Sequence, residues 1–69
     1  PNSKYKEQLA LLILKSKYKQ AQLSVEAKKE GRYRETIDEY YSFISEFPNT
    51  EASKEAEKIF KTSKEFVKD

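Results

Sequence analysis

The chain contains no cysteine, histidine, methionine or tryptophan. Without cysteine and histidine it has no disulfide, no thiolate nucleophile, no imidazole base and none of the usual soft metal ligands. Serine and threonine are present, but a catalytic triad needs a histidine to activate the hydroxyl. We therefore expect a protein that is not an enzyme and that holds no cofactor and no metal.

Glycine and proline are almost as scarce, with one glycine and two prolines in 69 residues. Long segments therefore contain no residue that breaks a helix. Five tyrosines and four phenylalanines, together with regularly spaced apolar residues, argue against disorder. A chain of this length buries only about 60% of the surface that it exposes when unfolded, so we expect one small domain, residues 1–69, with a marginal core.

The sequence has no run of eighteen apolar residues, and its first residues lack the layout of a signal peptide. Any membrane anchor is thus expected outside residues 1–69. The net charge of +2 combines a basic part, residues 1–34, with nine Lys or Arg and three Glu, and an acidic part, residues 35–69, with five Lys and nine Asp or Glu. Attraction between neighbouring helices is the simplest interpretation, and a basic binding face is the alternative.

Residues 3–30 are free of proline and glycine and predict a helix of roughly 40 Å. Within this helix, residues 9–14, LALLIL, are apolar around the whole circumference. Such a segment needs cover on more than one side. Its large side chains form the candidate interaction surface: Leu9, Leu11, Leu12, Ile13 and Leu14.

Gly31 is expected to end this helix, because glycine is the residue that most often adopts the left-handed conformation after a helix. A second helix is predicted over residues 32–47, and Pro48 cannot continue it. So short a link makes the two helices antiparallel neighbours. Asn49 and Thr50 can then cap a third helix over residues 50–67, whose inward stripe is Ala52, Ala56, Ile59, Phe60, Ser63 and Val67.

An internal repeat with an offset of 47 residues relates the first and third helices. Pro1, Asn2 and Ser3 align with Pro48, Asn49 and Thr50, and without gaps Leu9 aligns with Ala56, Leu12 with Ile59, Ile13 with Phe60 and Ser16 with Ser63. This pattern is typical of arrays of stacked helix pairs. It predicts an all-α fold with one full repeat plus the first helix of the next.

The markers of this repeat resemble those of a tetratricopeptide (TPR) repeat: Gly31, Tyr33, Tyr40, Phe47 and Pro48. A TPR unit has about 34 residues, so about 13 additional residues are expected in the first helix. A straight first helix would then project its first third, including LALLIL, by roughly 15 to 18 Å beyond its partners.

Three segments cover nearly the whole chain: KYKEQLALLILKSKYKQAQLS, KKEGRYRETIDEYYSFISEFPNT and KEAEKIFKTSKEF. Together they resemble the C-terminal part of the BamD family, the TPR lipoproteins of the bacterial outer-membrane β-barrel assembly machinery. Thr36 and Phe43 depart from a generic TPR, which has small residues at these positions. The resemblance implies a periplasmic scaffold, held at the outer membrane by an N-terminal lipid, whose final repeats dock the β-barrel assembly subunit.

Other interpretations are open. The chain could be another periplasmic TPR adaptor, serving the cell envelope or division. Lys15, Lys17 and Lys19 with Tyr18 could form a nucleic-acid-binding face, since cationic and stacking contacts recur together. The acidic residues early in the second helix could hold a metal through oxygen ligands, but a solvated face is the simpler interpretation of this set: Glu35, Asp38 and Glu39.

The favoured function is a non-catalytic protein–protein interaction scaffold. The partners expected are other protein subunits and no nucleic acid. A membrane-surface helix is disfavoured because LALLIL lacks a two-sided pattern. LALLIL is expected either to be buried against a preceding repeat or to form a surface for a partner or for self-association. In the isolated chain, its five large side chains are expected to be buried between copies, giving a homo-oligomer.

Overall fold

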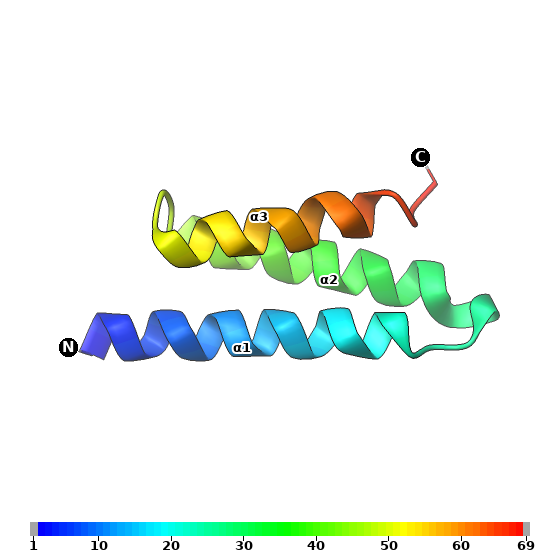
Figure 1. The fold of residues 1–69 in the computed structure, drawn as a ribbon, viewed down its shortest axis with the longest axis horizontal. Helices are drawn as coiled ribbons and strands as arrows, with labels where there is room; N and C mark the ends of the chain where they lie inside the picture. Colours follow the sequence, from blue (N-terminus) through cyan, green and yellow to red (C-terminus); the bar gives the residue numbers. More distant parts are fainter. Residues whose placement is uncertain (1, 69) are drawn as a thin grey trace.

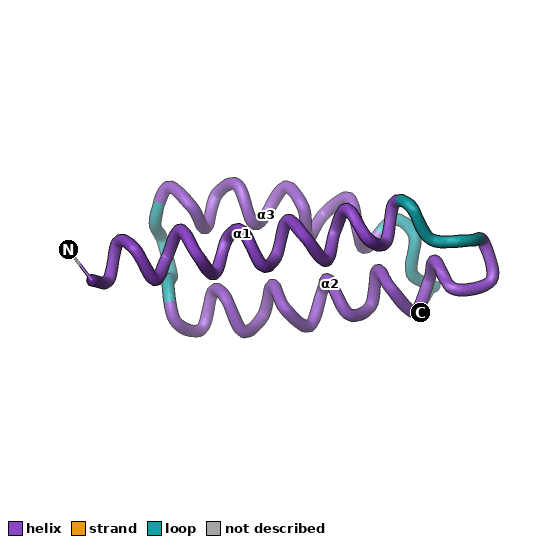
Figure 2. The backbone as a smooth tube through the Cα atoms, turned by 90° about the horizontal axis from the view of Figure 1, so that it is seen from below, coloured by secondary structure: helices purple, strands orange, loops and turns teal. Residues whose placement is uncertain are grey.

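The computed structural model describes residues 2–68, and over these residues the chain forms three helices and no strand. Helix α1 spans Asn2–Gln22, α2 spans Glu26–Glu46 and α3 spans Glu51–Lys64. α2 runs antiparallel to α1, and α3 returns parallel to α1, in a bundle that measures 41 × 20 × 14 Å (Figure 1). Each helix packs against both others (Figure 2). The all-α prediction and the antiparallel first pair are thus confirmed.

The first helix ends eight residues before the predicted boundary. The chain reverses at residues 23–25, so the predicted helices over residues 3–30 and 32–47 have the wrong common boundary. Gly31 lies inside α2, its φ is not positive, and its Cα faces open space. The prediction that Gly31 forms the turn is therefore wrong. A glycine inside a helix costs only about 1 kcal/mol relative to alanine, which the packing of neighbouring residues readily exceeds.

Packing explains why the earlier reversal is favoured. α1 and α2 have 21 residues each, so α2 covers nearly the whole of α1, whereas a helix over residues 32–47 would be too short to do so. The projection of roughly 15 to 18 Å that follows from a straight 28-residue helix is absent. The N-terminal end of α1 extends beyond α3 and the end of α2, and at the opposite end of the bundle the start of α2 extends beyond α1 (Figure 1).

The core lies along the line where the three helices meet. Leu11 and Leu14 of α1 pack with two aromatic side chains of α2 and three small or aliphatic side chains of α3: Tyr40, Phe43, Ala52, Ala56 and Ile59. The inward stripe predicted for α3 is confirmed at four buried positions, Ala52, Ala56, Ile59 and Ser63, while Phe60 and Val67 are half-buried. α3 ends at Lys64, earlier than the predicted residue 67, because residues 65–67 form turns.

The turn between α2 and α3 follows the prediction. α2 ends at Glu46, directly before the Phe47-Pro48 pair, and Asn49 adopts a left-handed φ of 57°. Asparagine tolerates this conformation better than most residues. Thr50 then caps α3 in a reciprocal capping box, in which its own N–H donates to Ser53 Oγ at 2.8 Å and Ser53 N–H donates to Thr50 Oγ1 at 3.0 Å.

Two buried serines of α3 differ in their hydrogen bonding, and this difference gives a matched pair of variants. Ser53 Oγ completes the capping box, whereas the Ser63 hydroxyl is fully buried and has no hydrogen-bond partner within residues 2–68. We expect Ser53→Ala to lower the free energy of unfolding by about 1 kcal/mol. Ser63→Ala should raise it by about 1 kcal/mol, because an unpaired buried hydroxyl is removed and alanine favours the helix.

Urea unfolding followed by circular dichroism measures both changes. Equal losses for the two variants would contradict the hydrogen bonding described for α3.

Candidate functional site

The predicted interaction surface of residues 9–14 divides into two faces of α1. Leu11 and Leu14 are 5% and 0% exposed and belong to the core. Leu9, Leu12 and Ile13 are 45%, 59% and 44% exposed. The prediction of one surface made by all five side chains is therefore wrong, because α2 and α3 together cover one side of the segment and leave the other side bare.

The bare side forms a continuous apolar stripe. Tyr5, which is 69% exposed, lies one turn before Leu9, and Leu12 and Ile13 lie one turn after it. We call these four residues the outer α1 stripe: Tyr5, Leu9, Leu12 and Ile13. The predicted interaction surface did not include Tyr5, although the spacing of four residues between Tyr5 and Leu9 places both on one helix face.

Lysines border the outer α1 stripe on both sides. At about 100° per residue, Lys6 and Lys17 lie beyond Ile13 along one edge, and Lys15 and Lys19 lie beyond Leu12 along the other. Lys15 forms an ion pair with Glu55 of α3. Glu7 is the only acidic residue of α1, and it is half-buried on the opposite side of the helix. The exposed face of α1 is thus apolar in the middle and basic at its edges.

The aromatic repeat markers have a structural role. The rings of Tyr33 and Phe66 stack with centroids 4.3 Å apart, and those of Tyr40 and Phe60 stack at 4.4 Å. Burial raises the pKa of both tyrosines above the ordinary value, and for Tyr40 the negative charge of Glu57 adds to this effect. Phe47 is half-buried at the end of α2, next to the exposed Pro48. These residues hold α2 against its neighbours.

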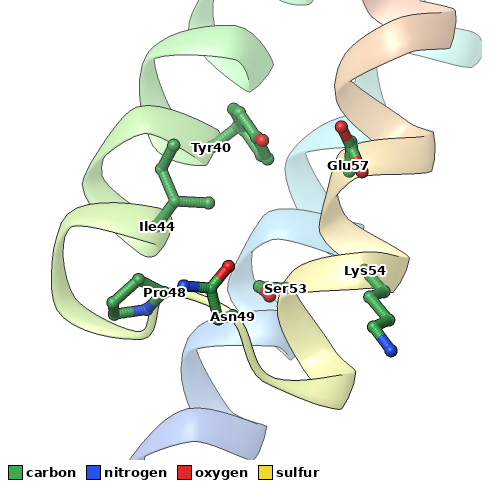
Figure 3. Close-up of a pocket in the computed structure, with 7 residues that line it drawn as sticks. All are labelled: Tyr40, Ile44, Pro48, Asn49, Ser53, Lys54 and Glu57. Atoms are coloured by element: carbon green, nitrogen blue, oxygen red, sulfur yellow. The ribbon is translucent and has the colours of Figure 1, made fainter.

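A shallow depression of about 420 Å³ lies between the end of α2 and the start of α3. Figure 3 shows its lining side chains, which come from α2, from the turn at residues 47–50 and from α3: Tyr40, Ile44, Pro48, Asn49, Ser53, Lys54 and Glu57. Lys54 extends away from the others (Figure 3), and the Ser53 hydroxyl is engaged in the capping box. Sequence reasoning did not identify this depression, which has no nucleophile beside a base.

The other candidate clusters do not assemble into sites. Within residues 2–68, no three acidic side chains are grouped closely enough to hold a metal ion. Glu35 lies 3.9 Å from Arg32 as an ion pair on the surface of α2. Tyr18 is half-buried, and its ring meets that of Tyr33 edge-on with centroids 6.2 Å apart, so it does not share an exposed face with Lys15, Lys17 and Lys19.

The division of residues 9–14 into two faces can be measured by a second matched pair. Leu11→Ala removes a core side chain and is expected to lower the free energy of unfolding by about 2–5 kcal/mol. Leu12→Ala, one residue away, should change it by less than about 0.5 kcal/mol, because Leu12 is exposed. Urea unfolding of both variants tests this expectation. A Leu12→Ala loss as large as that of Leu11→Ala would mean that Leu12 is in the core.

No helix within residues 2–68 has the length and apolarity needed to span a membrane. When the chain is compared with protein-family models, curated proteins and solved structures, no match is found. The exposed face of α1 and the three-helix fold are therefore the observations on which a function can be argued.

Proposed function

We propose that the chain is a non-catalytic protein–protein interaction scaffold, built as one TPR-like αα repeat followed by the first helix of the next. By its sequence resemblance, it acts as the C-terminal part of a BamD-like lipoprotein of the outer-membrane β-barrel assembly machinery. Its place is then the periplasm, with the membrane contacted only through a lipid outside residues 1–69. Its partners are other protein subunits, among them the β-barrel assembly subunit.

One observation carries the scaffold proposal: α3 is the sequence repeat of α1, and it lies parallel to α1 while packing against both helices of the α1–α2 pair (Figure 1). In a helical array, the first helix of each repeat packs against the second helix of the repeat before it. α3 packs against α2 in this manner through Ala56, Ile59 and Phe60. A rigid array of this kind binds partners by shape and charge, without chemical groups that react.

The role in β-barrel assembly can be tested by deletion in the cell. The longer protein that the resemblance implies would be tagged and purified from cell envelopes, with and without residues 1–69. We expect the β-barrel assembly subunit to co-purify with the complete protein and to be lost, or reduced at least about tenfold, after the deletion. A deletion that replaces residues 1–69 by a flexible linker of equal length controls for spacing.

An undiminished complex after the deletion would overturn this proposal. Co-purification of cell-division or peptidoglycan proteins instead would identify the chain as another periplasmic TPR adaptor.

A further inference from the structure

The two helices related by the internal repeat bury opposite faces. The residues of α3 that correspond to the outer α1 stripe through the offset of 47 are Ala52, Ala56, Ile59 and Phe60. The first three are at most 8% exposed and Phe60 is half-buried. Conversely, Leu11 and Leu14 are core residues of α1, whereas their counterparts, Lys58 and Lys61, are exposed. The exposed stripe of α1 thus corresponds to the face that α3 buries.

The α1–α2 pair covers that face in α3. Phe60 stacks on Tyr40 of α2 at 4.4 Å and meets Tyr41 of α2 edge-on at 5.5 Å. Ala52, Ala56 and Ile59 share a buried cluster with Leu11 and Leu14 of α1 and with Phe43 of α2. The equivalent positions of α1 have no helix against them within residues 2–68. The repeat therefore indicates that helices are the kind of element that fits along this face of α1.

The side chains of α1 also indicate the composition of that helix. Tyr5 and Leu9 stand where α3 has the small residues Ala52 and Ala56. Larger side chains on α1 leave less room for those of a helix packed at the same distance. A covering helix with small or aliphatic side chains therefore fits where α2 has aromatic rings. Lys6, Lys17 and Lys19 line the edges, and an acidic border on the covering helix would be complementary to them.

We propose that the outer α1 stripe docks an amphipathic helix of a partner protein, with small and aliphatic residues along its contact face and acidic residues at its borders. This inference rests on the proposed scaffold function and adds the chemistry of the partner. The contact is of the helix-against-helix type, in which side chains at spacings of three and four residues provide the apolar anchors.

The charges beside the stripe disfavour a second copy as its occupant, and the size of the stripe disfavours a lipid surface. If two copies paired through α1, the lysines of one copy would face those of the other, which opposes association. A second copy also cannot offer the inner face of its α2 to the stripe, because its own α1 and α3 already cover that face. A lipid surface needs a broad apolar face. The outer α1 stripe has four apolar side chains, and the opposite side of α1 is committed to the core.

Peptide binding to the intact chain tests the proposal. The probe is a synthetic, fluorescently labelled helical peptide of 21 residues with Ala and Leu at the a and d positions of each heptad and Glu at the e and g positions. The control peptide carries Lys in place of Glu. In low salt, fluorescence anisotropy should show the acidic peptide binding at least about tenfold more tightly than the basic one, because only the acidic borders complement the lysines.

Chain variants locate the binding face. Leu12→Glu should weaken binding of the acidic peptide at least about tenfold, since it places a charge in the apolar contact. Ser45→Glu introduces the same charge at an exposed position of α2 and should leave the affinity unchanged within about twofold. Circular dichroism confirms that both variants are folded, which Leu12 and Ser45 permit because both side chains are exposed.

Several results would overturn the proposal. These are equal affinity for the two peptides, equal effects of Leu12→Glu and Ser45→Glu, or no binding up to about 1 mM peptide. Concentration-dependent self-association that Leu12→Glu abolishes would assign the stripe to a second copy. Binding to vesicles containing phosphatidylglycerol, without peptide binding, would assign it to lipid.

The failure of this proposal is distinct from that of the scaffold function. If the acidic peptide does not bind but deletion of residues 1–69 still removes the β-barrel assembly subunit, only the docking inference fails.

Discussion

The chain reversal at residues 23–25 is the constraint on which the rest of the structure depends. Short-range hydrogen bonds hold its three residues. Leu23 N–H donates to Lys19 O at 3.1 Å, Ser24 N–H to Ala21 O at 3.2 Å, and the Ser24 hydroxyl to Gln20 O at 2.7 Å, while Val25 O accepts from Lys28 N–H at 2.9 Å. The position of this turn makes α1 and α2 equal in length. Within the bundle, Leu11 and Leu14 lie in the core, while Leu9, Leu12 and Ile13 face outward.

Contacts with the end of the chain hold the Gly31 region of α2 in place. Phe66 stacks on Tyr33, and Lys68 N–H donates to the Glu30 carboxylate at 2.9 Å. This bond, assisted by Arg34, holds the pKa of Glu30 below its ordinary value. Arg34 Nη2 also donates to Lys68 O at 2.8 Å. Packing and charge on both sides of Gly31 therefore compensate for the low helix propensity of glycine.

The sequence predicts best where local signals and burial agree. In α3, the cap at Thr50 and a regular apolar stripe indicate the same helix. Pro48 marks the end of α2 because proline has no backbone N–H to continue the helix. At Gly31 the two signals conflict. Glycine is typical of a helix end, whereas the aromatic contacts of Tyr33 favour a continuous helix through Gly31. These contacts join Tyr33 to Tyr18 and Phe66, which are distant in the sequence and come together only in the folded chain. For LALLIL, which is apolar on all sides, no periodicity could indicate which face is buried.

Hydrogen exchange of the backbone amides, measured by NMR on the intact chain, tests the position of the chain reversal most directly. The amides of Gly31 and Arg32 should exchange slowly, because they lie inside α2. The amides of Glu26 and Ala27 should exchange fast, because the first N–H groups of a helix have no partner within the helix and α2 has no side-chain cap. Slow exchange from residue 23 to residue 30 with fast exchange at Gly31 and Arg32 would contradict this account and restore a long first helix.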